Sequence, residues 1–292
     1  MPSTRDIRRR IKSVKNTAQI TKAMQMVAAS KMRRAQQAAL SGRPYAQLMN
    51  KVLAEVTDKA GDFTHPLMEA RTVERTGVLV VGTDKGLCGA LNSNLFREVT
   101  QFDKDSSEFV AAGRKASQFV ARTKRQLAAE FSYKDAPEFS EARVISKFVQ
   151  QWFLEGKVDR VDMVFTNFIS TLVQRSEVRI LLPLSEIKAV DAGVEGASGD
   201  TALERGTTEF LFEPGPNDVL GALLPHYLNF QIYQILLEAK ASEHSARMVA
   251  MKSATDNAQQ LIKDLTLEYN KIRQANITRE ILEISSAAMA LG

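Results

Sequence analysis

The sequence predicts an α/β domain combined with a long antiparallel coiled coil. Both ends of the 292-residue chain consist almost entirely of good helix-forming residues, and each end has an apolar stripe that it cannot bury alone. The middle of the chain instead alternates short β-rich runs with helical segments. Two long helices at opposite ends of one chain cover their stripes most simply by packing antiparallel on each other.

The N-terminal arm of the coiled coil is predicted over residues 1–58. Small or apolar residues recur there with alternating four- and three-residue spacing, which is the heptad pattern of a coiled-coil seam. The seam positions are Ile7, Ile11, Val14, Ala18, Thr21, Gln25, Ala28, Met32 and Ala35. Their side chains become smaller along the chain, which lets a partner helix approach closely. Gly42 and Pro44 predict a kink or break.

The C-terminal arm is predicted over residues 213–292. After Pro225, about 65 residues follow without a helix breaker, and at ~1.5 Å per residue they would span roughly 100 Å, more than a globular core needs. Its apolar stripe runs through Leu228, Ile232, Ile235, Ala239, Ala246, Val249, Leu261, Leu265, Ile272, Ile277, Ile281, Ile284, Ala288 and Leu291. The stripe weakens from Ser253 to Gln260, where we expect the helix to face its surroundings more than its partner.

After a connector at residues 59–76, residues 77–212 are predicted to form a Rossmann-like domain with a doubly wound sheet. Strands are expected at Gly77–Gly82, Glu108–Ala112, Leu127–Tyr133, Arg160–Phe168 and Thr171–Leu182, with helices near Ala90–Thr100, Arg114–Thr123 and Ser140–Glu155. The last two strands are joined too closely for a crossover, so they should pair antiparallel. Residues 185–206 are rich in Gly, Ala, Ser and Asp and predict a mobile loop.

Composition and charge exclude several classes of protein. Hydrophobic residues make up 44% and charged residues 25% of the chain, which argues against disorder, and no apolar run approaches the ~18 residues of a membrane span. A single cysteine, Cys88, excludes an internal disulfide framework. The net charge of +5 is uneven, because residues 1–43 hold eleven Lys/Arg and one Asp, leaving 28 Lys/Arg and 33 Asp/Glu elsewhere. The basic character therefore belongs to the N-terminal arm.

The segment Gly82–Gly89 lies between a predicted strand and a predicted helix, where nucleotide-binding folds place their phosphate loops. Its glycines at 82, 86 and 89 match neither common phosphate-loop spacing. We therefore favour a glycine-rich turn that allows tight strand-to-helix packing. His65, His226 and His244 are scattered singly, so they assemble neither a helical metal site nor a catalytic constellation. No cofactor, metal site or catalytic residue is predicted.

Four segments match motifs of one known family. They are ITKAMQMVAASKMRRAQ at Ile20–Gln36, GTDKGLCGALNSNL at Gly82–Leu95, ASEHSARMVAMKSATDNA at Ala241–Ala258 and ITREILEISSAAMA at Ile277–Ala290. On these residues the chain closely resembles the γ subunits of F-type ATP synthases, and the resemblance covers both helices and the sheet domain in the family's order. It implies a non-catalytic rotor, whose coiled coil stands in a ring of three α and three β subunits. The α/β domain would contact the ε subunit and the c-ring at the foot.

The resemblance also implies which residues meet these partners. Charged and flexible side chains of the basic arm would face acidic loops of the β subunits, a polar pair would meet another β loop, and the apolar C-terminal end would turn in an apolar collar. The residues are Arg8, Arg9, Lys12, Lys22 and Met24 for the acidic loops, Arg273 and Gln274 for the polar pair, and Ile281, Ile284 and Leu291 for the collar.

Two other functions stay open at this point. A basic coiled coil could bind nucleic acid, since clustered Arg and Lys neutralise phosphates, although the arm lacks interleaved aromatic residues. A nucleotide-dependent enzyme could use the Gly82–Gly89 turn. Because no transit peptide is recognised, the resemblance favours a peripheral protein on the cytoplasmic side of a bacterial inner membrane, with membrane contact only through the c-ring.

Overall fold

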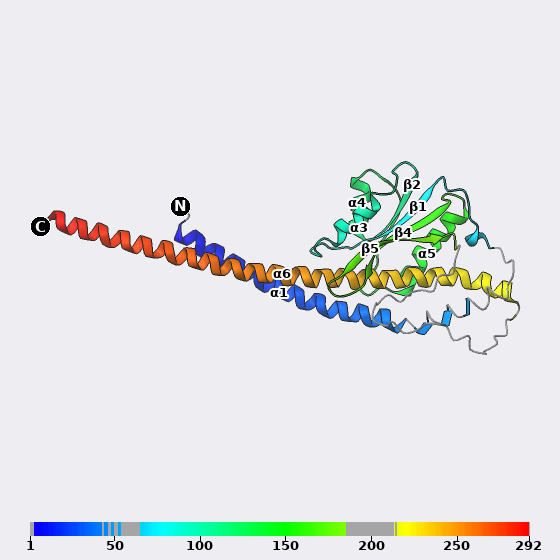
Figure 1. The fold of residues 1–292 in the computed structure, drawn as a ribbon, viewed down its shortest axis with the longest axis horizontal. Helices are drawn as coiled ribbons and strands as arrows, with labels where there is room; N and C mark the ends of the chain where they lie inside the picture. The colour runs from blue at the N-terminus through cyan, green and yellow to red at the C-terminus, as the bar shows by residue number, and fades with distance from the viewer. Residues whose placement is uncertain are drawn as a thin grey trace. The chain divides into compact units, whose positions relative to one another are not determined.

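The computed structural model describes residues 3–42, 44–45, 48–49, 52–53, 65–184, 213 and 215–291. It divides into two compact units, one made of Met1–Ala28 with Met248–Gly292 and one made of Ala29–Arg247. Helices α1 (Thr4–Ser41) and α6 (Pro216–Leu291) contribute to both units (Figure 1). The loop predicted at residues 185–206 lies outside the described residues, as do residues 59–64 of the predicted connector. Helix α1 ends at Ser41, where Gly42 predicted a break.

The first unit is a pair of antiparallel helices, as the heptad spacing predicted. Along α1 the predicted seam is the less exposed face, since all seven of its positions from Ile7 to Ala28 are buried or half-buried. The hydroxyls of Thr21 and Thr255 share a 2.7 Å hydrogen bond across the pair. Each hydroxyl also lies within hydrogen-bonding distance of a carbonyl in its own helix, so neither polar group is buried without a partner.

The sequence-based expectation for Ser253–Gln260 was wrong. Helix α6 keeps an unbroken four- and three-residue seam through this stretch, and its buried or half-buried positions are Met251, Thr255, Ala258, Ile262, Leu265, Tyr269 and Ile272. The seam looked interrupted because it is formed here by a polar residue and an alanine. Leu261, which the predicted stripe included, is 47% exposed, and the neighbouring Ile262 takes the seam position.

The second unit contains a five-stranded sheet in the order β3-β2-β1-β4-β5. Its strands are β1 (Thr76–Val81), β2 (Ser107–Ala112), β3 (Gln126–Phe131), β4 (Arg160–Phe168) and β5 (Gln174–Leu182). The first four strands are parallel, and β5 pairs antiparallel with β4, as the short connection between them predicted. This arrangement confirms the predicted fold class.

Helices cover both faces of the sheet (Figure 1). Helices α3 (Leu91–Val99) and α4 (Arg114–Arg122) pack on one face, and α5 (Phe139–Leu154) on the other, beside the short helix η1 (Pro66–Met68). Residues of β1 alternate between the two cores, with Val78 and Val80 facing α3 and α4 and Leu79 and Val81 facing α5. The continuous apolar run of β1 is therefore explained by burial on both faces.

The first half of α6 is part of the same core as the sheet and α5. Leu224, Tyr227, Leu228 and Ile232 are almost completely buried there. The sequence assigned Leu228 and Ile232 to a helix-pairing stripe, so the structure gives these residues a different partner. A stripe of 3.6-residue period shows that a helix buries one face, but it does not show whether a helix or a sheet covers that face.

Candidate functional site

The predicted contact residues of α1 lie on its exposed side. Arg8, Arg9, Lys12 and Lys22 are exposed, and Met24 is half-buried. Within the described residues, the one ion pair that these side chains make joins Arg9 to Asp6 at 3.3 Å, on the surface of the helix. Exposed pairs of this kind contribute little to stability. These cations are thus available to partners.

The predicted contact residues of α6 lie beyond its paired segment. No described side chain between Arg273 and Ala287 is buried, and Arg273, Gln274, Ile281 and Ile284 are all exposed. Helix α6 reaches Leu291, although the side chain of that residue lies outside the described part. Ile281 is 60% and Ile284 71% exposed, so this segment presents large apolar side chains to solvent. Such a surface marks an interaction site.

The glycine-rich segment after β1 leads into helix α3, and its first glycine packs tightly against helix α4. A Cβ on Gly82 would lie 2.9 Å from the Cβ of Ala116, closer than such atoms approach in proteins. The Thr83 hydroxyl donates to the carbonyl of Lys85 at 2.9 Å, and the Asn92 amide donates to Thr83 at 2.9 Å. These contacts support the prediction of a packing turn.

The same turn presents carbonyl oxygens, rather than N–H groups, to the side chain that faces it. The Arg247 guanidinium on α6 donates to the carbonyls of Lys85 at 3.2 Å and Gly86 at 3.2 Å. Phosphate loops bind anions through N–H groups at a helix N-terminus. A turn that offers carbonyls suits a cation, and this turn already holds one from its own chain. Its geometry therefore argues against nucleotide binding.

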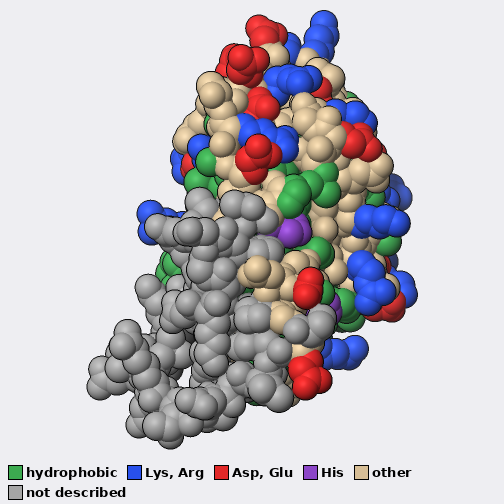
Figure 2. All heavy atoms as spheres, turned by 90° about the vertical axis from the view of Figure 1, so that its right-hand side faces the viewer, with side chains coloured by type: hydrophobic (Ala, Val, Ile, Leu, Met, Phe, Trp, Pro, Cys, Tyr) green, Lys and Arg blue, Asp and Glu red, His purple; other side chains and the backbone are tan. Residues whose placement is uncertain are grey.

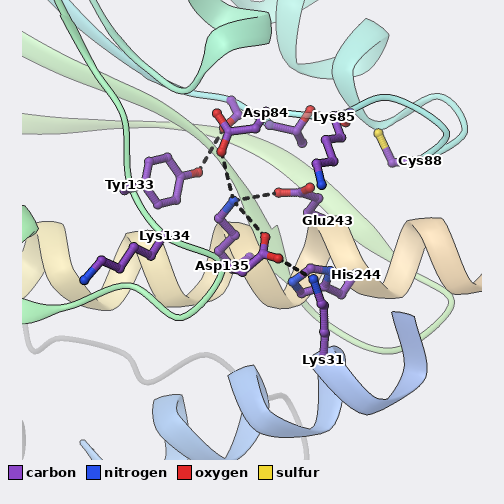
Figure 3. A network of polar contacts seen from close by, with 12 residues as sticks. Lys31, Asp84, Lys85, Cys88, Tyr133, Lys134, Asp135, Glu243 and His244 are labelled. Atoms are coloured by element: carbon purple, nitrogen blue, oxygen red, sulfur yellow. Dashed lines mark hydrogen bonds and ion pairs between the residues drawn. The ribbon is translucent and has the colours of Figure 1, made fainter. Parts of the chain in front are cut away.

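A polar cluster surrounds Lys240 on α6, whose side chain is fully buried. The carboxylates of Asp84, Asp135 and Glu243, which Figure 3 labels, lie 3.7, 3.8 and 3.2 Å from the Lys240 ammonium. The ammonium also lies 4.5 Å from the centre of the Tyr133 ring. We call this group of residues, together with Lys31 and Arg247, the Lys240 cluster.

The Lys240 cluster joins four parts of the second unit. Helix α6 supplies Lys240, Glu243 and Arg247, and Glu243 accepts a 2.7 Å hydrogen bond from Arg247. The turn after β1 supplies Asp84, and the segment after β3 supplies Tyr133 and Asp135. Helix α1 supplies Lys31, which bonds to Asp135 (Figure 3). The cluster holds three cations and three carboxylates: the side chains of Lys240 and Glu243 are almost completely buried, whereas those of Lys31 and Asp135 are 39% and 49% exposed.

Burial and neighbouring charge set the proton affinities in the cluster. Burial raises the pKa of Tyr133 well above its usual value, and the surrounding carboxylates raise it further. The phenol therefore stays protonated and donates to the carbonyl of Gly82 at 2.9 Å. The hydrogen bond from Lys31 lowers the pKa of Asp135, which keeps that carboxylate charged. Burial lowers the pKa of His244 to about 4, so this imidazole is neutral at pH 7.

A second set of polar contacts holds the same stretch of α6 to the sheet. The Ser242 hydroxyl donates to the carbonyl of Thr166 in β4 at 3.1 Å, and the Ser245 hydroxyl donates to the carbonyl of Thr171 at 2.7 Å. Both serines are completely buried. One helical segment is therefore fixed by polar contacts in two directions: hydrogen bonds and ion pairs to the segments after β1 and β3, and hydrogen bonds to β4 and the segment after it.

Sequence reasoning missed the Lys240 cluster because its members are distant in sequence and form no motif. One signal was present. Lys240, Glu243 and Arg247 share one helix face by their three- and four-residue spacing, directly after a long apolar segment. Three charges where a buried face continues indicate polar partners elsewhere in the fold.

On the face that Figure 2 shows, acidic and basic side chains are interspersed and hydrophobic ones form only small patches. Within the described residues, no group of three or more His, Cys, Asp or Glu side chains could hold a metal ion. None of the helices described is both long and apolar enough to span a membrane.

Comparison with known proteins agrees with this architecture. A family model described as ATP synthase matches residues 3–291. The ATP synthase gamma chain of Opitutus terrae is 51% identical and covers 99% of both chains, and that of Methylacidiphilum infernorum is 46% identical and covers both chains completely. Neither relative supports the nucleic-acid alternative.

Solved structures show the same fold. A chain of the Tetrahymena thermophila mitochondrial ATP synthase central stalk and c-ring is 25% identical, with a TM-score of 0.60 over 80% of this chain and 99% of that one. A chain of the Euglena gracilis mitochondrial ATP synthase gives a TM-score of 0.66 at 20% identity, over 99% of this chain and 94% of that one. On the family model and the full-length relatives, the chain belongs to the ATP synthase γ chains, the non-catalytic rotor subunits of the central stalk.

Proposed function

We propose that the two exposed surfaces of the paired helices are the contacts through which this rotor acts on the catalytic ring. As a central-stalk subunit, the chain couples rotation of the c-ring to ATP synthesis on other subunits. A rotor drives its neighbours only if it binds their conformations with different free energies. The surfaces of the first unit must therefore differ from one another. The exposed side of α1 is basic, and the C-terminal end of α6 exposes large apolar side chains.

The basic side of α1 is proposed to face acidic loops of the β subunits. Arg8, Arg9, Lys12 and Lys22 are exposed, and the seam positions beside them face α6. Long-range attraction to an acidic loop needs only the sign of the charge, so such contacts can form and break as the rotor turns. Met24, half-buried at the edge of the seam, would add a deformable apolar contact.

The C-terminal end of α6 is proposed to turn inside an apolar collar of the ring. The single observation that carries this proposal is the exposure of Ile277, Ile281 and Ile284 on a helix with no buried described residue after Ile272. An apolar contact has no preferred direction, so it resists rotation less than hydrogen bonds would. Arg273 and Gln274, just before this end, would form polar contacts with a β loop.

The α/β unit is proposed to contact the ε subunit and the c-ring. Through the c-ring the chain would be held at the cytoplasmic side of a bacterial inner membrane. We further propose the domain bounds given by the sequence, with residues 77–212 as the part that faces these partners. The relatives from bacteria with near-complete coverage support this location.

Reconstitution tests the function directly. Mixed α and β subunits should hydrolyse ATP cooperatively only when this chain is added, and the chain alone should have negligible ATPase activity. The measurement is the steady-state ATPase rate as a function of ATP concentration, with and without the chain. Equal rates and equal cooperativity in both mixtures would refute the rotor function. Stabilisation of the isolated chain by ATP would instead favour the nucleotide-binding alternative.

A further inference from the structure

We propose that the Lys240 cluster is a torque clamp, which locks α6 and α1 to the sheet so that rotation of the α/β unit turns both helices without slip. The inference rests on the rotor function. Torque enters or leaves the rotor through the α/β unit and passes along the helices, and both helices continue beyond this unit to form the helix pair. A firm attachment between helix and sheet is therefore required.

Apolar packing alone does not supply such an attachment. The segment of α6 before the cluster, from Leu220 to Ala239, lies on the sheet through apolar contacts. These contacts are non-directional, so they specify the axial and rotational position of the helix less sharply than directed bonds do. Charged hydrogen bonds have preferred distances and directions, and several of them together fix both the rotation and the axial position of a helix.

The contacts of the cluster have the geometry of a clamp. Arg247 donates hydrogen bonds to two carbonyls of the turn after β1. Lys240 forms ion pairs, longer than hydrogen bonds, with Asp84 of that turn at 3.7 Å and with Asp135 after β3 at 3.8 Å. Both cations also bind Glu243, which ties them together on one helix face. Asp135 in turn binds Lys31, so α1 is attached to the same point as α6.

Stability alone does not account for these charges. Replacing a buried ion pair by apolar residues of similar volume is often neutral or stabilising, because desolvation offsets the attraction. The cluster nevertheless places a fully buried lysine among three carboxylates, directly after an apolar segment of the same helix. An apolar face could give the same stability, but these charges also fix the position of α6 against the sheet.

The test compares coupling with hydrolysis in the assembled enzyme. Asp135→Asn removes a carboxylate shared by Lys31 and Lys240 while keeping the size of the side chain. Lys240→Met removes the central cation. Complete synthase carrying each variant is placed in lipid vesicles, and proton uptake and ATP hydrolysis are measured together. We expect a loss of protons pumped per ATP hydrolysed, with hydrolysis retained and a larger loss for Lys240→Met.

Lys134→Met is the matched control, because Lys134 forms an exposed ion pair with Glu138 in the same unit and, among the described residues, no ion pair with α6. It should pump protons as wild type does. If Asp135→Asn and Lys240→Met also couple like wild type, the clamp is refuted while the rotor function stands. If Lys240→Met fails to assemble, the clamp is tested by two other variants. These are Asp135→Asn and the double variant that combines it with Lys31→Met. Asp135→Asn should lose coupling, and the double variant should lose no more than Asp135→Asn alone, since Lys31→Met breaks only the Lys31–Asp135 pair that Asp135→Asn already removes. Wild-type coupling in both variants would refute the clamp.

Discussion

His244, near Lys240 on α6, buries a ring nitrogen that lacks a hydrogen-bond partner among the described residues. Its side chain is 2% exposed, its Nδ1 accepts a 3.4 Å hydrogen bond from Arg247, and its Nε2 has no hydrogen-bond partner among the described residues. Because arginine can only donate, Nδ1 must be unprotonated and the imidazole neutral. Glu243 and Asp135 favour the charged form, whereas Arg247 and Lys240 oppose it, and burial dominates.

Acid should therefore weaken the fold through His244. The pKa of His244 is about 4 in the folded protein, below the value of about 6.5 for an unfolded histidine. Between these values the unfolded chain binds the proton more readily, so the free energy of unfolding falls as pH drops from about 6.5 towards 4. His244→Gln removes this contribution, and its stability loss between neutral and mildly acidic pH should be smaller than that of wild type.

Urea unfolding of both proteins at the two pH values measures this difference. Carboxylates such as Asp135, whose pKa is lowered chiefly by its bond from Lys31, lose their contribution at more acidic pH and are common to both proteins. Equal pH-dependent losses in wild type and His244→Gln would show that the folded imidazole is protonated as easily as the unfolded one.

At the level of whole elements, small side chains shape the helix pair. Thr21 and Ala28 on α1 and Thr255 and Ala258 on α6 are all buried. Threonine and alanine project little beyond the backbone, so the helices approach closely enough for two threonine hydroxyls to bond across the interface. The seam is specified by size as much as by hydrophobicity.

Enlarging one seam residue should consequently destabilise the pair. Ala258→Leu adds volume at a buried position and should lower the free energy of unfolding by about 1–3 kcal/mol through overpacking. Asn257→Leu makes a similar addition at the exposed neighbouring position and should change stability by less than about 0.5 kcal/mol. Guanidinium unfolding followed by far-ultraviolet circular dichroism measures both. Similar losses in the two variants would mean that Ala258 is not in a tight seam.

Elements defined by a local pattern could be predicted from the sequence, and those defined by distant contacts could not. Strand β4 was predicted with its observed bounds, Arg160–Phe168, because β-branched and apolar residues between turn signals identify a strand locally. The seam of α6 near Thr255 was missed because small and polar residues carry no hydrophobic signal. The Lys240 cluster was missed because Asp84 and Asp135 join α6 only through the fold. The resemblance, not periodicity, supplied the predicted contact residues.

Across the whole molecule, the two ends differ in how far they are paired. With Thr21 opposite Thr255 in an antiparallel pair, α1 begins near the level of Ile272 on α6. The remaining 19 residues of α6, from Arg273 to Leu291, have no partner helix among the described residues and would span about 28 Å. The exposed isoleucines of this segment need cover, which we propose that other subunits give.

Charge at this end should consequently act on assembly and not on the isolated chain. Ile284→Asp replaces an exposed side chain, so the free energy of unfolding of the chain alone should change by less than about 0.5 kcal/mol. In the complex it would bury an unpaired charge in the proposed collar and lower both the yield of assembled ring and its ATPase rate. Ile284→Val, which stays apolar, is the control. Normal assembly of Ile284→Asp would place Ile284 in water.

The close seam around Thr21 and Thr255 also has a mechanical consequence. Two helices whose axes lie near each other make a thin rod, and a thin rod twists further under a given load than a thick one. A rotor that is firmly fixed at one end and thin along its length can wind up while one catalytic site is still waiting for its substrate. It can then release that strain smoothly once the site is ready. Alanine and threonine at the seam would thus make the helix pair torsionally elastic while it transmits rotation.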